Sequence, residues 1–358
     1  MTQSPPPDDP TLDLPFAHGG PVLSGRLRAS PEDFVVEEQL GYQASGDGEH
    51  VFLTVRKRER NTQDVARAIA RLAGVPQVAI GYAGLKDRNA VTTQHFSVQL
   101  PGREAPDWST IEDESLQVIA AQRHNRKIRR GSLRGNRFRI RVDSVVGDVA
   151  EAERQLQRIR DAGVPNYFGS QRFGRGGQNL RRADDLLAGR GRRGGREQRS
   201  MILSAARSQL FNQVLAARVN AGTWDRAIAG DVMSLAGSQR QFMYDAADPT
   251  IADRLARLDV HPTGPLCGRP GRALQVEADA RLNEERALAE AQSWIEGLTR
   301  LGLDADRRSL RLVADGLDWS WQDNSLLLSF QLVAGAFATA VLREIVRSHD
   351  ADEADPDS

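Results

Sequence analysis

A chain of 358 residues with 40% hydrophobic and 27% charged residues can bury a sizeable core, which argues against global disorder and suggests two domains or one large one. Its 48 basic and 48 acidic residues cancel, so any basic surface has to be local, and the single cysteine, Cys267, excludes an intramolecular disulfide and fits a reducing cytosol. No run approaches the roughly 20 apolar residues of a membrane span, and the N-terminus lacks a signal-peptide pattern, so we expect a cytoplasmic protein.

The first third of the chain predicts strands followed by one well-delimited helix. The β-rich runs 34–36 and 51–55 are separated by a glycine-rich turn. In the helix that follows, Asn61 or Thr62 can act as the N-cap and Gly74 suits the C-cap. Its apolar stripe consists of Val65, Ile69 and Leu72.

Two later strands are predicted by alternation. The stretch 94–100 alternates, and 137–142 does so more strictly, with Phe138, Ile140 and Val142 on one face and three arginines on the other. Strands and helices mixed in this order predict an α+β core with a mixed, mainly antiparallel sheet.

The character of the sequence changes near residue 163. The segment VPNYFGSQRFGRGGQNL is aromatic, glycine-rich and irregular, and it leads into GRGRRGGREQR (189–199), which we expect to be mobile. The remaining predicted elements are an amphipathic helix at 200–219, one long helical pattern from 280 to 301, a strand at 325–332 and a closing helix at 337–346. The acidic termini, including the tail ADEADPDS, are expected to be frayed. The simplest organisation is a core built from both chain ends and interrupted by an inserted domain.

The densest basic run is QRHNRKIRRGSLRGNRFRIR (122–141), which contains no acidic residue. Such side chains bind phosphates independently of sequence, although a solvated basic face is the plainer alternative. Aromatic rings inside the run and in the following loop favour nucleic acid, because unstacked bases stack on them. The candidates for contacts with an RNA backbone are Lys86, Arg126, Lys127, Arg130 and Arg172.

Several common kinds of site lack support. The glycine-rich loop 169–177 does not end in the Gly-Lys-Ser/Thr of a P-loop, and no serine lies in a G-x-S-x-G turn. No two histidines have metal-ligand spacing, so we expect no metal site. The histidines are His18, His50, His95, His124, His261 and His349. Carboxylates are therefore the favoured source of chemistry.

Asp87 is the carboxylate in the most suggestive surroundings. It lies in a loop between two apolar elements, flanked by Lys86 and Arg88, and Gly84 gives the loop backbone freedom. Nearby cations favour the ionised form of a carboxylate, which can act as a nucleophile or a general base. From these surroundings alone, a surface aspartate paired with its neighbours remains the plainer interpretation.

The segment AGLKDRNAVTTQ (83–94) resembles the catalytic motif of the TruD pseudouridine synthases, which modify uridine 13 of certain tRNAs. Further segments resemble the family in its order, and together they extend from about residue 25 to about residue 345. They are PEDFVVEE, GEHVFLTVRK, NTQDVARAIA, GSLRGNRFRI, GVPNYFGSQRFGRGGQNL, LSAARSQLFNQVLAARV and LVAGAFATAVLREI. The least similar parts are the termini and about 222–310.

The resemblance implies a pseudouridine synthase-like catalytic domain formed by 1–161 and 311–358, with a disordered acidic tail, and an α/β TruD insertion domain at 162–310. The implied reaction detaches uracil from ribose C1′, turns the base and rejoins it through C5, without cofactor or metal. The implied partner is tRNA, and we expect a monomer with no obligate protein partner.

The resemblance also implies roles for single residues. Asp87 falls on the catalytic aspartate, whose carboxylate attacks the ribose or the base, or assists glycal formation. Phe138 falls near the flipped uridine, and Asn136 falls on a position that can hydrogen-bond the substrate. Arg28 stands where relatives carry a lysine, as the ion-pair partner of the aspartate, and arginine keeps the charge but changes the geometry. Further substrate-lining positions are Phe34 and Phe337.

Two other functions remain open at this point. A non-catalytic RNA-binding protein, a synthase-like scaffold acting as an RNA chaperone, would share the basic and aromatic features but would not depend on Asp87. A base-excising glycosylase acting on DNA would also flip a base beside an acidic residue, and it would release free uracil.

Overall fold

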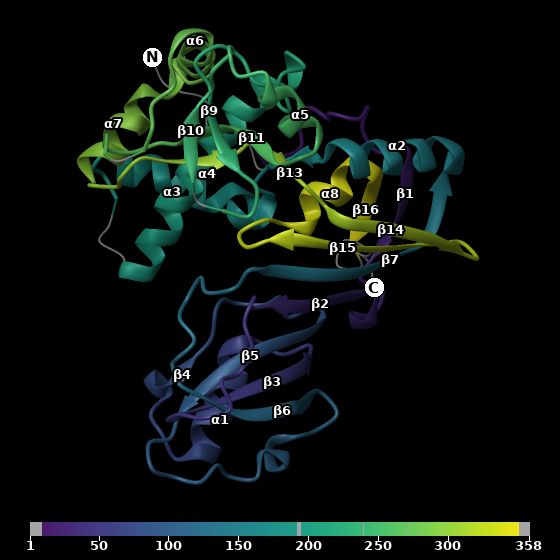
Figure 1. Ribbon diagram of the computed structural model, residues 1–358, viewed down its shortest axis with the longest axis vertical. Coiled ribbons are helices and arrows are strands. Elements are labelled where there is room, and N and C mark those ends of the chain that lie inside the picture. Colours follow the sequence, from purple (N-terminus) through teal and green to yellow (C-terminus); the bar gives the residue numbers. More distant parts are fainter. Residues whose placement is uncertain (1–8, 192–194, 239, 272, 351–358) are drawn as a thin grey trace. The chain divides into compact units, whose positions relative to one another are not determined.

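The structure is a computed structural model that describes residues 9–191, 195–238, 240–271 and 273–350 (Figure 1). The chain forms two compact units. The sheet unit comprises Val22–Ala150, Ala314–Gly335 and the segment from Val346 onward. The helix-rich unit comprises the segment up to Pro21, Glu151–Val313 and Ala336–Ile345. Residues 1–8 and 351–358, expected to be frayed, lie outside the described residues.

The sheet unit is built on a ten-stranded sheet with the order β14-β15-β7-β2-β5-β3-β6, to which β1, β16 and β4 are added at the side. The pairs β2–β5 and β1–β16 are parallel and the other pairs are antiparallel, which confirms the predicted mixed, mainly antiparallel sheet. The strands are β1 (Leu23–Leu27), β2 (Phe34–Gln39), β3 (His50–Arg58), β4 (Ile80–Gly81), β5 (Val91–Gln99), β6 (Leu116–His124), β7 (Gly135–Gly147), β14 (Asp315–Gln322), β15 (Ser325–Val333) and β16 (Val346–Asp350).

One helix, α1 (Thr62–Ala73), packs against this sheet in the same unit. Its apolar stripe, Val65 and Ile69, joins buried residues of β3 and β5 in a single hydrophobic cluster. The helix ends where Gly74 takes the left-handed conformation, with φ 61°, as a glycine C-cap does. The predicted helix and both of its ends are confirmed. Three short 3-10 turns complete the unit, at Pro31–Asp33, Gln77–Ala79 and Trp108–Ile111.

Strand β7 alternates as predicted, with Phe138, Ile140 and Val142 buried and Arg137 and Arg139 exposed. Because directly paired residues point to the same face of a sheet, the register defines a row across five strands. This row runs Phe330, Phe138, Val36, Thr92 and Lys57 on β15, β7, β2, β5 and β3.

In its described residues, the helix-rich unit combines seven helices with a four-stranded antiparallel sheet of order β10-β9-β11-β12 and the short pair β8–β13. Its helices are α2 (Val149–Ala162), α3 (Gln178–Leu187), α4 (Arg196–Asn220), α5 (Thr250–Ala256), α6 (Ala278–Ala287), α7 (Gln292–Arg300) and α8 (Ala338–Ile345). Its strands are β8 (Val164–Pro165), β9 (Val232–Leu235), β10 (Gln241–Met243), β11 (Val260–Leu266), β12 (Asp306–Ser309) and β13 (Arg311–Leu312). Short 3-10 turns lie at Ser170–Arg172, Arg175–Gly177 and Ala289–Ala291.

The helix-rich unit also contains segments from both chain ends, which the predicted boundaries assign to the catalytic domain. Side chains hold the first of these segments in place. Gln155 Nε2 on α2 donates to the backbone oxygens of His18 and Gly20, and buried Glu344 on α8 accepts from the amides of Ala17 and His18. These contacts join the start of the chain to α2 and α8 within one compact unit.

Two expectations about elements are wrong, and one strand was not predicted. The pattern from 280 to 301 forms two helices, because the chain leaves helical dihedrals at Leu288 and Ala291, and Leu288 is thereby buried in an apolar cluster. In the run expected to be mobile, residues 196–199 belong to α4, and residues 192–194 lie outside the described part. The predicted closing helix is confirmed as α8, and β16, which was not predicted, follows it in parallel with β1. None of the described helices is long and apolar enough to cross a membrane.

Candidate active site

Asp87 lies in the loop between β4 and β5 and is paired with Arg28, the residue that follows β1. Arg28 Nη2 donates to Asp87 Oδ2 at 2.9 Å, and the Asn89 amide donates to Oδ1 at 3.2 Å. The side chains of Arg28 and Asp87 remain 19% and 36% exposed. The carboxylate is thus oriented by two donors while it stays accessible.

Arg28 is held in an unusual conformation. Its φ is 54°, in the left-handed region that residues other than glycine rarely adopt. Its guanidinium carbon lies 4.4 Å from the centre of the Phe34 ring, so the cation packs on an aromatic face as well as on Asp87. This conformation turns the arginine back over β2.

The loop that carries Asp87 is anchored by two buried polar side chains. Thr62 Oγ1, at the start of α1, accepts from the Lys86 amide at 3.0 Å and donates to Gln94 Oε1 at 2.9 Å. Gln94 Nε2 on β5 donates to the Gly84 carbonyl at 2.7 Å. These bonds fix the loop backbone on the residues before Asp87.

Lys86 is turned toward the protein interior. Its Nζ lies 2.8 Å from Glu38 Oε1, and the two side chains are 7% and 0% exposed. Burial acts to raise the pKa of Glu38, but hydrogen bonds from His95 and the charge of Lys86 outweigh it and lower the pKa. Lys86 was expected on an RNA backbone; in this structure its ammonium is engaged by a buried carboxylate and helps to fix the loop.

Sequence reasoning missed Lys57, which lies beneath the same loop. The Lys57 side chain is buried, and its Nζ donates to the Asp87 carbonyl at 2.9 Å and to the Arg60 carbonyl at 2.6 Å. The sequence does contain a signal, because Lys57 follows Leu53 and Val55 in the alternation of β3 and therefore points to the buried face.

An aromatic cluster lies on one face of the sheet, the face to which the row through Phe138 points. The Phe138 ring stacks on Phe330 with 5.5 Å between centroids, and it contacts Phe34 edge-on at 6.2 Å. Asn136 lies on the same face, two residues earlier on β7, and its Oδ1 is buried with no hydrogen-bond partner among the described residues. A buried acceptor of this kind can receive a hydrogen bond from a bound molecule.

Phe337 and Arg172 belong to the helix-rich unit and lie close together. The Arg172 guanidinium carbon is 5.6 Å from the Phe337 ring centre and 5.4 Å from that of Phe168. Arg172 Nη1 donates to Ser204 Oγ at 3.3 Å, and Arg172 forms no ion pair with a described residue. Burial lowers the pKa of Arg172. Arg308 also lies over Phe168, at 4.3 Å. Two guanidiniums therefore share one aromatic cluster.

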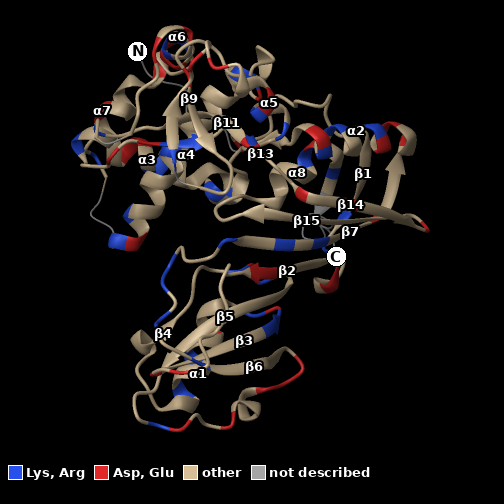
Figure 2. Ribbon diagram, viewed as in Figure 1, with Lys and Arg blue, Asp and Glu red and all other residues tan. Residues whose placement is uncertain are grey.

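The basic run 122–141 lies in the sheet unit, and Figure 2 shows its positive residues along β7 and the segment that leads into it. Arg126 and Arg130 are exposed and pack on the rings of Tyr42 and Tyr82, at 5.1 and 4.2 Å. Lys127 Nζ donates to a backbone carbonyl. The two arginines thus present charge at the surface, whereas Lys127 is engaged by the protein.

The basic turn, which is the segment 125–134 between β6 and β7, lies beside the loop of Asp87. The Gly131 amide donates to the Ala83 carbonyl at 2.7 Å. At Gly81 a Cβ would come within 2.4 Å of the Ile128 carbonyl oxygen, so only glycine permits this close approach. The start of the Asp87 loop and the basic turn are therefore held together within the sheet unit.

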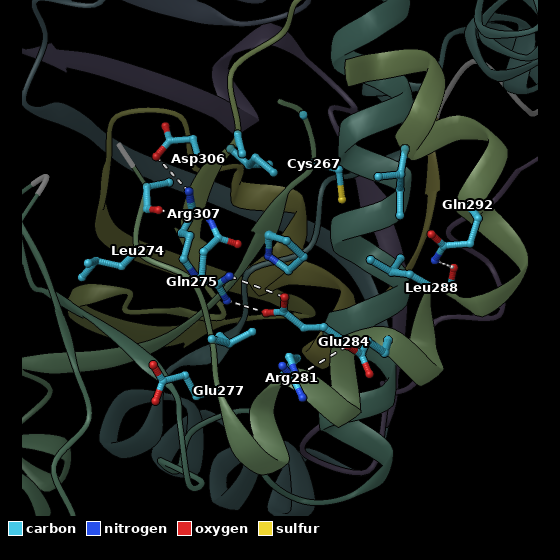
Figure 3. A pocket seen from close by; sticks show the side chains of 18 residues that line it. Cys267, Leu274, Gln275, Glu277, Arg281, Glu284, Leu288, Gln292, Asp306 and Arg307 are labelled. Atoms are coloured by element: carbon cyan, nitrogen blue, oxygen red, sulfur yellow. Dashed lines mark hydrogen bonds and ion pairs between the residues drawn. The ribbon is translucent and has the colours of Figure 1, made fainter. Parts of the chain in front are cut away.

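A separate cavity of ≈ 550 Å³ lies in the helix-rich unit (Figure 3). Arg307 is ion-paired with Glu284 in its wall, and burial raises the pKa of Glu284. Burial also raises the pKa of Cys267 to about 12, which leaves its thiol protonated and unreactive at neutral pH. Among the described residues no group of three or more His, Cys, Asp or Glu could hold a metal ion.

Comparisons with known proteins give one consistent result. A family model described as tRNA pseudouridine synthase D (TruD) matches residues 15–188 and 194–345. A tRNA pseudouridine synthase D of Methylococcus capsulatus is 50% identical over 342 residues, which cover 95% of this chain and 96% of the relative. One of Xanthomonas campestris pv. campestris is 47% identical over 359 residues, covering 96% and 97%. A crystal structure from Methanosarcina mazei, described as a putative tRNA pseudouridine synthase D, shares the fold with a TM-score of 0.71 at 21% identity, covering 92% of this chain and 95% of that one.

Proposed function

This chain belongs to the tRNA pseudouridine synthase D (TruD) family, and on that premise we propose that it is an isomerase that converts uridine 13 of certain tRNAs to pseudouridine. In this reaction the N1–C1′ bond of the uridine breaks and a C5–C1′ bond forms. C5 loses its proton and N1 gains one, so the reaction is balanced without a cofactor or metal. The enzyme is proposed to act in the cytoplasm as a monomer.

The observation that carries the proposal is the pair Arg28–Asp87 on an anchored loop. The resemblance assigns Asp87 the role of nucleophile, and its carboxylate is oriented by Arg28 yet remains 36% exposed. A positioned and accessible carboxylate is what nucleophilic catalysis requires. Arg28 supplies the charge that relatives obtain from lysine.

The target base has to leave the stack before C1′ and C5 can be reached. We assign Phe34 and Phe138 of the sheet unit to the walls that receive it, and Phe337 of the helix-rich unit is proposed separately as a substrate contact. Stacking on an aromatic ring contributes on the order of 1–3 kcal/mol per base, which offsets part of the unstacking. Asn136 Oδ1, buried and without a partner among the described residues, is suited to accept a hydrogen bond from an N–H of uracil.

Contacts with the tRNA backbone are assigned to Arg126, Arg130 and Arg172. The first two are exposed beside the Asp87 loop, and Arg172 forms no ion pair with a described residue. Lys86 and Lys127 were candidates for the same role, but both ammonium groups already bind protein oxygens. We therefore assign them to the support of the loop and of the basic turn.

We retain the assignment of residues 1–161 and 311–358 to the catalytic domain and of 162–310 to the insertion domain. Asp87, Arg28 and the basic run all come from the first of these segments. A single polypeptide segment thus supplies the proposed nucleophile, its partner and the basic turn beside them.

The test uses tRNA that carries tritium at C5 of uridine, because formation of the new bond releases that tritium. Asp87→Asn is expected to abolish release while tRNA binding is retained, and Asp47→Asn, an exposed aspartate on another loop of the same unit, serves as the control. Full release by Asp87→Asn would refute the assigned nucleophile, and free uracil in the products would favour a glycosylase. In cells that lack the protein, an unchanged position 13 would refute the substrate.

A further inference from the structure

Lys57, near the end of β3, is a buried lysine with an unusual set of partners. It is 1% exposed, and it forms no ion pair with any residue that the structure describes. Its two hydrogen bonds go to main-chain carbonyls, to Asp87 at 2.9 Å and to Arg60 at 2.6 Å. Buried lysines are normally paired with a carboxylate, since removing an ammonium from water costs several kcal/mol.

The position of Lys57 on the sheet suggests why a charge is retained there. Lys57 is paired with Thr92 on β5, and the row continues through Val36 to Phe138. Lys57 therefore points to the face that carries the aromatic cluster. An apolar residue at this buried position of β3 would avoid the cost of removing a charge from water. The lysine is therefore explained by its contact with the loop above it and not by packing in the core.

We propose that Lys57 is a positioning residue whose protonated ammonium fixes the main chain of Asp87, while Arg28 fixes its carboxylate. This inference rests on the proposed function of Asp87. The residues before Asp87 are anchored through Thr62 and Gln94, but at Asp87 itself the main chain is held by Lys57. Two cations, one on β3 and one just after β1, thus fix the main chain and the side chain of the same aspartate.

The charge state of Lys57 gives the inference a pH signature. Burial lowers the pKa of Lys57 to about 8; the Asp87 carboxylate opposes this effect and the Lys86 ammonium adds to it. Its directly paired neighbours, Thr92 on β5 and Leu116 on β6, carry no charge. As the pH rises through about 8, Lys57 loses its proton and one charged donor to the Asp87 carbonyl is lost.

Stability changes in the opposite direction over the same range. In the unfolded chain Lys57 keeps its proton up to its ordinary pKa of 10.5, so between about 8 and 10.5 the unfolded state binds more protons. The free energy of unfolding contributed by this group therefore rises with pH. A loss of activity above pH 8 that stems from Lys57 is thus separable from unfolding.

The experiment compares Lys57→Met and Lys57→Arg with Arg56→Met, which removes the same charge from the exposed neighbouring position of β3. Tritium release is measured under saturating tRNA from pH 6.5 to 9.5, together with tRNA affinity and thermal unfolding. We expect Lys57→Met to lower kcat by about 10²-fold, as a misplacement of about 1 Å does, with tRNA affinity unchanged. Arg56→Met is expected to match the wild type.

The pH profiles distinguish positioning from mere structural support. The wild-type rate is expected to fall above pH 8, whereas Lys57→Met gives a low and flat profile, and Lys57→Arg recovers part of the rate without the decline. A folded Lys57→Met with the wild-type kcat would overturn the inference. If Lys57→Met does not fold, a wild-type profile that is flat to pH 9.5 overturns it instead.

The Asp87→Asn variant separates the two possible failures. If Asp87→Asn is inactive while Lys57→Met is fully active, the inference about Lys57 fails and the proposed function stands. If Asp87→Asn is active, the proposed function fails and the role of Lys57 fails with it.

Discussion

Two arginine–aspartate pairs in this protein have the same 2.9 Å contact and different surroundings. In the helix-rich unit, Arg218 binds both oxygens of Asp231, donates to the carbonyls of Thr223 and Arg226, and is buried with its partner, at 3% and 1% exposure. In the sheet unit, Arg28 makes one hydrogen bond to Asp87, and its own Nε has no partner among the described residues.

The difference indicates what each pair does. The first pair is saturated, because its donors and acceptors are satisfied inside the protein, as a structural ion pair requires. The second pair keeps unused hydrogen-bonding capacity and solvent access, as a reacting group requires. The number of hydrogen-bond partners, rather than the distance between the charged groups, therefore distinguishes the structural pair from the proposed catalytic pair.

The largest effect is expected from Asp87→Asn. Loss of a nucleophile lowers the rate by about 10⁴-fold or more, whereas a solvent-accessible ion pair contributes about 0–1 kcal/mol to stability. Single-turnover tritium release and chemical denaturation measure the two quantities on the same preparation. A variant that loses its fold together with its activity would contradict the contrast between the two pairs.

Asp231→Asn is expected to show the reverse behaviour. Removing one member of a buried pair leaves Arg218 uncompensated, and the free energy of unfolding should fall by about 3–5 kcal/mol. The kcat of the molecules that remain folded should equal that of the wild type. Urea denaturation and kcat at low temperature check this, and a selective loss of kcat would show that Asp231 is not purely structural.

Arg28→Met and Arg28→Lys test how the charge and the geometry of Arg28 affect the solvent-accessible pair with Asp87. The methionine removes the orienting charge and should lower kcat by about 10²-fold, a typical loss for a misoriented reacting group. The lysine restores the charge with a different geometry and should recover most of the rate. The ratio of the two kcat values is the measurement. Equal rates for the two variants would mean that charge at this position does not matter.

The smallest effect is expected from Arg126→Gln, outside both pairs. Loss of one phosphate contact should weaken tRNA binding several-fold at low salt and reduce the slope of log K against log salt by about 1. The kcat at saturating tRNA should not change. Fluorescence anisotropy at several salt concentrations tests this, and an unchanged slope would remove Arg126 from the interface.

The sequence predicts elements that depend on neighbouring residues, and it misses elements that depend on contacts between distant residues. Strand β7 and helix α1 were predictable because alternation and helix caps are local signals. The split between α6 and α7 was not, because each segment has helical composition and the break is set by the burial of Leu288. Strand β16 pairs with β1 from the other end of the chain, so nothing near it in sequence announces it.

The same holds for the site. The motif around Asp87 identified the candidate nucleophile, but the inward turn of Lys86 depends on Glu38, which lies 48 residues earlier. The alternation of β3 indicated that Lys57 is buried. Its proposed role, however, follows only from its hydrogen bond to the Asp87 carbonyl, which the sequence does not reveal. Loop side chains take their direction from distant partners, and a sequence motif does not specify those partners.

We propose that Asp87, oriented by Arg28 and accessible to solvent, performs the isomerisation at uridine 13. The most direct measurement is single-turnover formation of pseudouridine in a tRNA transcript, mapped to the nucleotide, with wild-type protein and Asp87→Asn in parallel. Our account predicts modification at position 13 by the wild type and none by the variant, with equal tRNA affinity. Modification of position 13 by Asp87→Asn at the wild-type rate would contradict it.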